Sequence, residues 1–193
     1  MTTTQHTFDR LQDLIKGIRV AVLVTHVREG FHGRPMQTLE GPEDGRLLFF
    51  TSASSPKVLD LKRNPHVSLV YADSSTHRYV FVTGRARLTV DRARFEKYFR
   101  ATDKLWYPRG VDDPDLRLLE VTVESALFWT KPGLIGTAVA LANAITGEGP
   151  REIGDSGMLE FGPPSAADPE TKAAPRRASK RARNAPRERS AHH

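Results

Sequence analysis

Hydroxyl and cationic side chains gather in one stretch of the sequence, residues 33–57. Arg34 lies near its start, Lys57 ends it, and the hydroxyl residues between them are Thr51, Ser52, Ser54 and Ser55. The oxygens of a phosphate monoester are held best by charge-assisted hydrogen bonds, which cations and hydroxyls can donate. The stretch therefore predicts a phosphate-binding site. Composition alone leaves a solvated hairpin with a serine-rich loop as the alternative.

A short helix is expected directly after the hydroxyl-rich loop, over residues 56–64. Pro56 suits the first turn of a helix, and Pro65 ends it. The free amides of a helix N-terminus favour an anion. Lys57 and these amides are therefore expected to point at the same phosphate.

The remaining elements predict a mainly β protein. Strands are expected at residues 20–27, 34–39, 46–51, 66–72, 79–90, 116–123 and 127–130, and helices at 8–18 and from Asp91 to residue 103. Pro35 indicates an edge strand or a bulge, and Gly84 a bulge or bend. Five or six mostly antiparallel strands with a few short helices favour a small β-barrel over a doubly wound parallel sheet.

The last part of the chain differs from the rest in composition. Residues 162–193 contain no Val, Ile, Leu, Met or aromatic residue, and carry a net charge of +5 out of +6 for all 193 residues. We expect a folded domain over residues 1–161 and a disordered basic tail over 162–193. Such a tail predicts weak, nonspecific contact with nucleic acid. The alternative is a solubilising extension.

Composition and patterning also exclude several classes of protein. The chain has no cysteine, which excludes disulfides and thiolate metal sites. No apolar run approaches a membrane span of about 18 residues, and the polar N-terminus has no signal-peptide core, so a soluble cytoplasmic protein without membrane contact is expected. The histidines show no metal spacing, and Asp112, Asp113 and Asp115 beside Pro114 are interpreted as a solvated turn. After Pro132, residues 133–147 predict a helix at a subunit contact or across the barrel.

Six short sequence motifs together resemble those of a known family. They are GRPM, FFTSASSPK, NPHVSLVY, VTGRA, PRGVDDPDLRLLEV and the ending LFW, in that order across residues 8–161. Together they resemble the pyridoxamine 5'-phosphate oxidase-like FMN-binding split barrels, and among these the general stress protein branch. The resemblance implies a six-stranded antiparallel barrel of the Greek-key type, and a homodimer with flavin at the interface.

The resemblance also implies a set of cofactor-binding residues. Arg34, Ser55 and Lys57 would hold the phosphate, while Met36 and Gln37 would bond the edge of the isoalloxazine ring through their backbone. The other residues implied to contact flavin are Phe50, Thr51, Tyr79, Trp106 and, from the partner subunit, Trp129. No catalytic residue is implied.

One departure from the family pattern bears on the substrate. True pyridoxamine phosphate oxidases follow the last Trp with an Arg-Leu-His-x-Arg-type segment that grips the substrate, whereas Trp129 is followed by Thr130-Lys131-Pro132-Gly133. Oxidation of pyridoxamine phosphate is therefore not expected. The resemblance implies an FMN-dependent oxidoreductase acting on an unknown small substrate. The alternatives are a non-catalytic flavin-binding stress protein, a deazaflavin-dependent reductase, or FAD as the cofactor.

Overall fold

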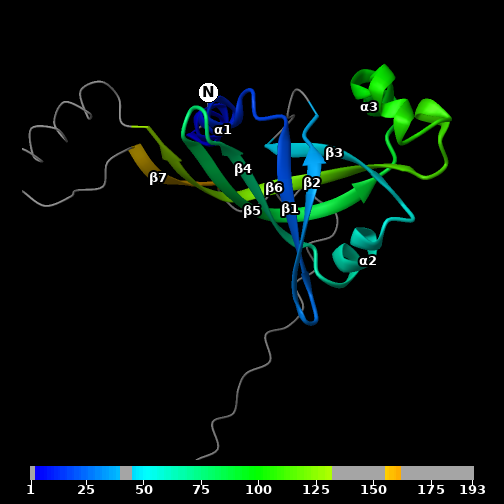
Figure 1. Cartoon of the computed structure of the whole chain (residues 1–193), viewed down its shortest axis with the longest axis horizontal. Coiled ribbons are helices and arrows are strands. Elements are labelled where there is room, and N and C mark those ends of the chain that lie inside the picture. Colours follow the sequence, from blue (N-terminus) through cyan, green and yellow to red (C-terminus); the bar gives the residue numbers. More distant parts are fainter. Residues whose placement is uncertain (1–2, 40–44, 132–154, 162–193) are drawn as a thin grey trace, which may run out of the picture.

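The computed structural model describes residues 3–39, 45–131 and 155–161. Seven strands and a few short helices make up this part of the chain (Figure 1). In chain order the elements are α1 (Thr3–Ile15), β1 (Val20–Val27), β2 (Gly30–Gln37), β3 (Arg46–Ser52), α2 (Pro56–Arg63), β4 (His66–Asp73), β5 (Arg78–Thr89), α3 (Arg92–Tyr98), η1 (Ala101–Leu105), η2 (Gly110–Asp112), β6 (Leu116–Thr130) and β7 (Asp155–Glu160).

The strands form one strongly curved antiparallel sheet in the order β2-β1-β4-β5-β6-β3. Strand β6 is long enough to pair β3 with its first half and β7 with its second half, along the same edge. The two outer strands, β2 and β3, meet at a single bridge between Thr38 and Phe49. The barrel is therefore split between these two strands, and the sheet is not closed. The prediction of a mainly β, antiparallel fold is confirmed, and the strand order is non-sequential, as in Greek-key folds.

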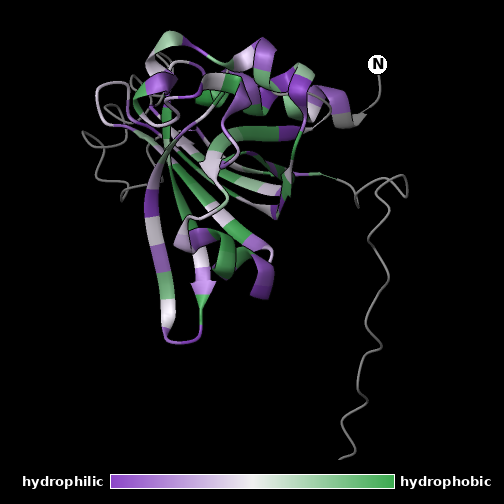
Figure 2. Cartoon of the chain, turned by 90° about the vertical axis from the view of Figure 1, so that its right-hand side faces the viewer, coloured by the Kyte–Doolittle hydropathy of each residue, from purple (hydrophilic) through white to green (hydrophobic). Residues whose placement is uncertain are grey.

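The core lies inside the curved sheet, because alternate residues of each strand point inward. Leu23, Leu69 and Val82 are fully buried on the inner face, and helix α1 adds Phe8 and Leu11. Figures 1 and 2 show α1 at the upper end of the sheet and α2 at the lower end, beside the projecting β1–β2 hairpin. Figure 2 shows apolar colouring along the strands of the sheet and mixed colouring on the helices.

A second apolar cluster attaches α3 to the outer face of the sheet. It includes Phe95 and Tyr98 of the helix. Asp91 caps α3 as predicted, since its carboxylate accepts a hydrogen bond of 3.1 Å from the Arg94 amide. The buried carboxylate of Glu120 on β6 accepts one from Arg94 Nη1 at 3.0 Å. The helix is therefore held to the sheet by packing and by a charged hydrogen bond.

Two details of the sheet were predicted correctly. Pro35 lies on an edge strand, where a missing amide costs no ladder bond. The β5–β6 register shifts between Thr83 and Gly84, which is the predicted bulge. A Cβ at Gly84 would lie 2.2 Å from the Thr122 carbonyl oxygen. The close approach of β5 to β6 at this bulge therefore requires glycine.

Several elements differ from the prediction: β2 begins at Gly30 rather than Arg34, and α3 ends at Tyr98 rather than at residue 103. The two strands expected at 116–123 and 127–130 are one strand, because the polar residues between them are paired: Ser125 with Thr83 at 2.8 Å and Glu124 with Arg85 at 2.9 Å. The sheet has a seventh strand, β7, which the weakly patterned residues 155–160 form along β6.

The first helix begins at residue 3 rather than near Thr7. Its first turns are polar and lack the apolar spacing that marked the predicted helix, but the Gln5 side chain donates to Asp9 at 2.9 Å, one turn later. The helix predicted at 133–147 and the tail at 162–193 lie outside the described residues. Within the described ranges, no helix is long and apolar enough to cross a membrane.

Candidate functional site

The split between β2 and β3 brings the predicted phosphate residues together. The antiparallel bridge of Thr38 with Phe49 fixes the register of the two strands, which would place Met36 opposite Thr51 if pairing continued. Among the described residues pairing does not continue, so the strands diverge beyond the bridge. Beside this gap, Arg34 of β2 bonds to Asp60 of α2, and Lys57 in the first turn of α2 bonds to Thr51 of β3.

Lys57 is held by two hydroxyls at the start of α2. Its Nζ donates to Thr51 Oγ1 at 2.9 Å and to Ser55 Oγ at 2.8 Å. Burial, and then the nearby charge of Arg34, hold the pKa of Lys57 below its ordinary value. An anion placed between these two cations would relieve their repulsion.

Arg34 is positioned by two residues that the sequence analysis missed. Its Nη2 donates to Asp60 Oδ2 at 2.8 Å and its Nη1 to Thr25 Oγ1 at 3.0 Å, while the Thr25 hydroxyl donates to Asp60 at 3.0 Å. The hydrogen bond from Arg34 holds the pKa of Asp60 below its ordinary value. Asp60 follows Lys57 by three residues on a predicted helix, so helical spacing already placed both on one face.

The charges at the split suit one phosphate group. Arg34 pairs with one buried carboxylate, Asp60, and Lys57 lies near Arg34, so these two cations and one carboxylate carry a net positive charge. The hydroxyls of Thr51 and Ser55 add neutral hydrogen-bonding groups beside Lys57. This donor set fits a phosphate monoester, whereas no group of His, Asp or Glu in the described ranges could hold a metal ion.

Asp115 was also missed, because it was interpreted as part of a solvated turn. Its two carboxylate oxygens accept from the amide and the hydroxyl of Ser54, at 2.8 and 2.6 Å. These hydrogen bonds, led by that of the Ser54 hydroxyl, hold the pKa of Asp115 below its ordinary value. Asp115 thus lies in a turn, as predicted, but it also binds the hydroxyl-rich loop, which the turn interpretation did not include. No spacing in the sequence links residues 54 and 115.

Three other predicted residues lie on the two strands that border the split. Met36 is buried in the main core and lies in register with Ala21 of β1, and Gln37 is exposed at the end of β2. Phe50 points to the outer face, where its ring centroid lies 5.8 Å from that of Phe99 and 6.4 Å from that of Tyr107. Contact of these residues with a cofactor stays a prediction.

The remaining aromatic residues do not join the Lys57 cluster within one chain. Tyr79 and Trp129 are paired in register on the outer face of the sheet, and both side chains are more than two-fifths exposed. Trp129 comes seven residues after Thr122, the last partner of β3 in the described register. Trp106 is 78% exposed at the end of η1. Contact of these three residues with a cofactor stays a prediction.

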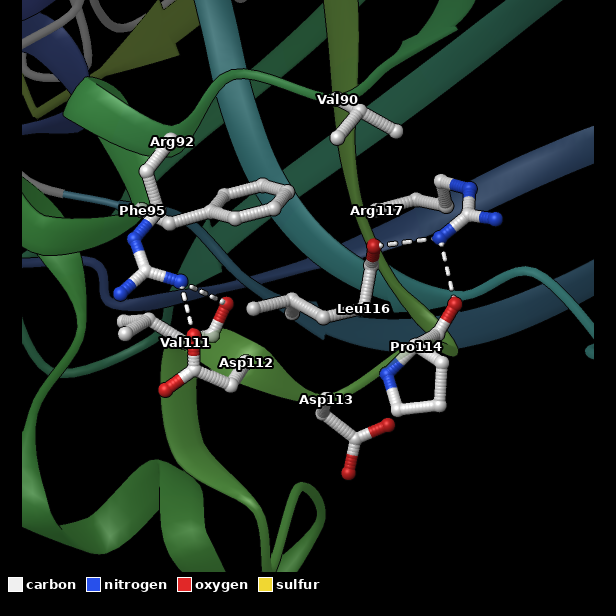
Figure 3. Close-up of a pocket in the computed structure, with 9 residues that line it drawn as sticks. All are labelled: Val90, Arg92, Phe95, Val111, Asp112, Asp113, Pro114, Leu116 and Arg117. Atoms are coloured by element: carbon white, nitrogen blue, oxygen red, sulfur yellow. Dashed lines mark hydrogen bonds and ion pairs between the residues drawn. The ribbon is translucent and has the colours of Figure 1, made fainter.

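A cavity of about 400 Å³ lies elsewhere, between the start of α3 and the turn before β6 (Figure 3). Val90, Phe95 and Leu116 give it apolar walls, and Arg92 and Arg117 lie at its edge. None of the ten predicted residues lines it. The split, and not this cavity, is therefore the candidate cofactor site.

Comparisons with known proteins agree with this geometry. Solved structures with the same fold include the general stress protein 26 from Jannaschia sp. CCS1, at 20% identity and a TM-score of 0.63, covering 83% of this chain and all of the other. The general stress FMN/FAD binding protein from Xanthomonas citri is 25% identical, with a TM-score of 0.56, over 65% of this chain and 89% of that one.

A curated relative matches a shorter segment. The protein bli-3 of Neurospora crassa is 28% identical over 90 residues, which are 42% of this chain and 43% of that protein. The chain thus aligns with less than half the length of this relative. A family model, described as pyridoxamine 5'-phosphate oxidase like, matches residues 6–150. The match covers most of the chain, including both strands that border the split and α2. The chain belongs to the pyridoxamine 5'-phosphate oxidase-like family.

Proposed function

We propose that the protein binds FMN at the split, with the phosphate between Lys57 and Arg34. The observation that carries this proposal is the Lys57 cluster, in which a partly buried ammonium group is held by Thr51 and Ser55 close to a second cation. Ser55 and Thr51 would then share their hydroxyls between Lys57 and phosphate oxygens. Asp60 would keep the Arg34 guanidinium oriented toward them.

The ring of the flavin would lie along the diverging edges of β2 and β3. Edge strands offer backbone amides and carbonyls, and these suit the polar atoms of an isoalloxazine ring. Gln37 lies at the end of β2 on that edge and is exposed, and Met36 beside it is in register with Ala21 of β1. The relative from Xanthomonas citri is described as binding FMN and FAD, which supports a flavin here. We favour FMN over FAD because the cluster suits a single phosphate.

A homodimer would complete the site. One row of apolar side chains crosses six strands on the outer face of the sheet in direct register: Pro35, Val22, Val70, Phe81, Leu127 and Met158. Tyr79 and Trp129 form the neighbouring row. Val22 is 42% and Met158 58% exposed in one chain. A contiguous apolar surface of this kind favours burial against another protein surface. A second copy, seated on this apolar row, would bring Trp129 to the partner's split.

The proposed activity is a flavin-dependent oxidoreduction of a small substrate. Bound flavin would supply hydride transfer, and the chain would supply binding, orientation and electrostatics. Lys57 and Arg34 would fix the phosphate end, while exposed aromatic residues such as Trp129 would exclude water from the ring. Thr130 and Lys131 follow Trp129 in place of the substrate-gripping segment, so pyridoxamine phosphate is not the proposed substrate.

The experiment is to purify the full chain and to identify its bound small molecule by absorbance and mass. We expect the yellow absorbance band and the mass of FMN. The Lys57→Ala variant should fold and lose about 10- to 100-fold in affinity for FMN, as expected for loss of a hydrogen bond from a charged group. FMN affinity that is unchanged in this variant contradicts the site. A deazaflavin or FAD as the copurifying molecule contradicts the choice of cofactor. Oxidation of a reduced nicotinamide by the yellow protein tests the activity.

A further inference from the structure

Asp115 makes three hydrogen bonds to two successive residues of the hydroxyl-rich loop. Its carboxylate accepts from the Ser54 amide at 2.8 Å and from the Ser54 hydroxyl at 2.6 Å. Its main-chain oxygen accepts from the Ala53 amide at 2.7 Å. The two carboxylate bonds are charge-assisted, and they fix both the backbone and the side chain of Ser54.

The loop that Asp115 holds leads directly into the proposed phosphate site. Ser55 follows Ser54, and its hydroxyl accepts from Lys57 at 2.8 Å. The Ser55 amide in turn donates to the Ser52 carbonyl at 3.1 Å, so the loop is one tight turn. A change in the position of Ser54 would therefore move Ser55 and the start of α2 together.

Hydrogen bonds from neighbouring residues stabilise the turn that contains Asp115 (Figure 3). Arg117 Nη1 donates to the carbonyl oxygens of Pro114 and Leu116, at 2.9 and 2.8 Å. The Asp115 amide donates to Asp113 Oδ1 at 3.0 Å. Asp115 is thus presented to the loop by a turn with several internal bonds, at the start of the central strand β6.

Ordinary loop packing does not require this arrangement. Ser54 is exposed to solvent, so its amide and hydroxyl could bond to water at little cost. The bidentate contact with Asp115 instead holds an exposed loop in one conformation. Rigid placement of binding groups reduces the ordering cost of binding.

We propose that Asp115 is a positioning residue that orders the Ser52–Ser55 loop for phosphate binding. The proposal rests on the proposed function, since the loop has this role only if the split binds a phosphate. Asp115 itself would not touch the phosphate, because a carboxylate and a phosphate repel each other. It acts through Ser54, and it sets the affinity for the phosphate end of the cofactor rather than for the ring.

The test compares two ligands that differ only in the phosphate. Affinities of the full-length apoprotein for FMN and for riboflavin are measured by quenching of flavin fluorescence. We expect Asp115→Ala to weaken FMN binding about tenfold while riboflavin binding changes less than about twofold. Asp115→Asn retains an acceptor for the Ser54 amide and a donor for its hydroxyl, so its FMN affinity should lie between those of wild type and Asp115→Ala.

Asp112→Ala is the matched control, because Asp112 belongs to the same segment but bonds to Arg92. Its FMN affinity should equal that of wild type. Ser54→Ala removes the hydroxyl bond but keeps the amide bond to Asp115, so it should weaken FMN binding less than Asp115→Ala, and the double variant should be no weaker than Asp115→Ala. Equal losses for FMN and riboflavin in Asp115→Ala, or additive losses with Ser54→Ala, would overturn the proposal.

The order of the loop is also measurable without any cofactor. In the apoprotein, amide hydrogen exchange at Ser54 should be faster in Asp115→Ala than in wild type, whereas exchange in β3 should not change. Unchanged exchange together with unchanged FMN affinity overturns the proposal while the proposed function stands. A wild-type protein that binds neither FMN nor riboflavin overturns the proposed function, and the role of Asp115 toward phosphate with it.

Discussion

Asp60 Oδ2 on α2 lies 2.8 Å from Arg34 Nη2 on β2, which joins the helix to one edge of the split. The Asp60 side chain is 10% and the Arg34 side chain 23% exposed, so most of this ion pair is removed from water. Arg34 neutralises a buried carboxylate, and in the proposed site it would also bind the phosphate. Lys57 has no such carboxylate partner in the described structure. Its replacement therefore tests phosphate binding without leaving a buried carboxylate unpaired.

The first prediction concerns stability. Arg34→Ala leaves Asp60 buried without its cation, and we expect a loss of about 1–3 kcal/mol in the free energy of unfolding at pH 7. In the double variant Arg34→Ala/Asp60→Asn, the unpaired buried carboxylate is replaced by a neutral amide. The double variant should therefore be more stable than Arg34→Ala alone. Urea unfolding of the four proteins measures this cycle. Strictly additive losses would show that the two residues do not interact.

The second prediction follows from the lowered pKa of Asp60. A carboxylate whose pKa is lower in the folded state than in the unfolded state stabilises the fold above the unfolded pKa, here the ordinary 3.8. This contribution is lost as pH falls through the folded pKa. The stability difference between wild type and Asp60→Asn should therefore be largest above about pH 5 and shrink in acid. Thermal unfolding from pH 7 to pH 3 tests this, and a difference that grows in acid contradicts it.

Much of this architecture is predictable from local sequence patterns. The turn and proline signals bounded β1, β3 and α2 to within a residue or two, and Gly84 marked the bulge because no other residue fits there. Strand β7 was missed, since its backbone pairs with β6 without a strong apolar pattern of its own.

At the site, local patterns identify cations and hydroxyls but not what positions them. Lys57, Ser55 and Thr51 fall within seven residues, so one loop and one helix start already place them together. Thr25 and Asp60 meet Arg34 only after three separate elements pack, and Asp115 reaches Ser54 across 61 residues. Such contacts depend on tertiary structure, and a single sequence carries little trace of them.

The third prediction concerns the pH dependence of FMN binding. Burial and Arg34 lower the pKa of Lys57 in the free protein, and a bound phosphate dianion would raise it again. Binding then favours protonated Lys57, so affinity is highest below the pKa of the free protein and falls as pH rises above it.

Titration from pH 7 to pH 10 with FMN and with riboflavin measures this effect. Riboflavin lacks the phosphate but shares the ring, so its affinity corrects for ionisation of the ring. The ratio of the FMN and riboflavin affinities should fall with rising pH in wild type and stay constant in Lys57→Ala. A ratio that is independent of pH in wild type would show that Lys57 does not bind the phosphate.

The fourth prediction concerns the apolar row on the outer face. Val22 lies on β1 between Pro35 of β2 and Val70 of β4, and it is 42% exposed in one chain. Val22→Asp should leave the protomer folded, since the side chain does not enter the core. It should nevertheless weaken dimerisation, because a charge buried in an interface has to be removed from water.

Sedimentation of wild type and Val22→Asp, with Lys62→Asp as a control, decides the question. Lys62 is an exposed residue of α2 outside the row, so its replacement should leave a dimer. If Trp129 of one chain covers the split of another, Val22→Asp should lose FMN affinity together with dimerisation, although it touches neither Lys57 nor Arg34. A monomeric Val22→Asp protein with wild-type FMN affinity would show that one chain holds the whole site. A wild-type protein that sediments as a monomer would contradict the proposal that a second copy of the chain covers the apolar row.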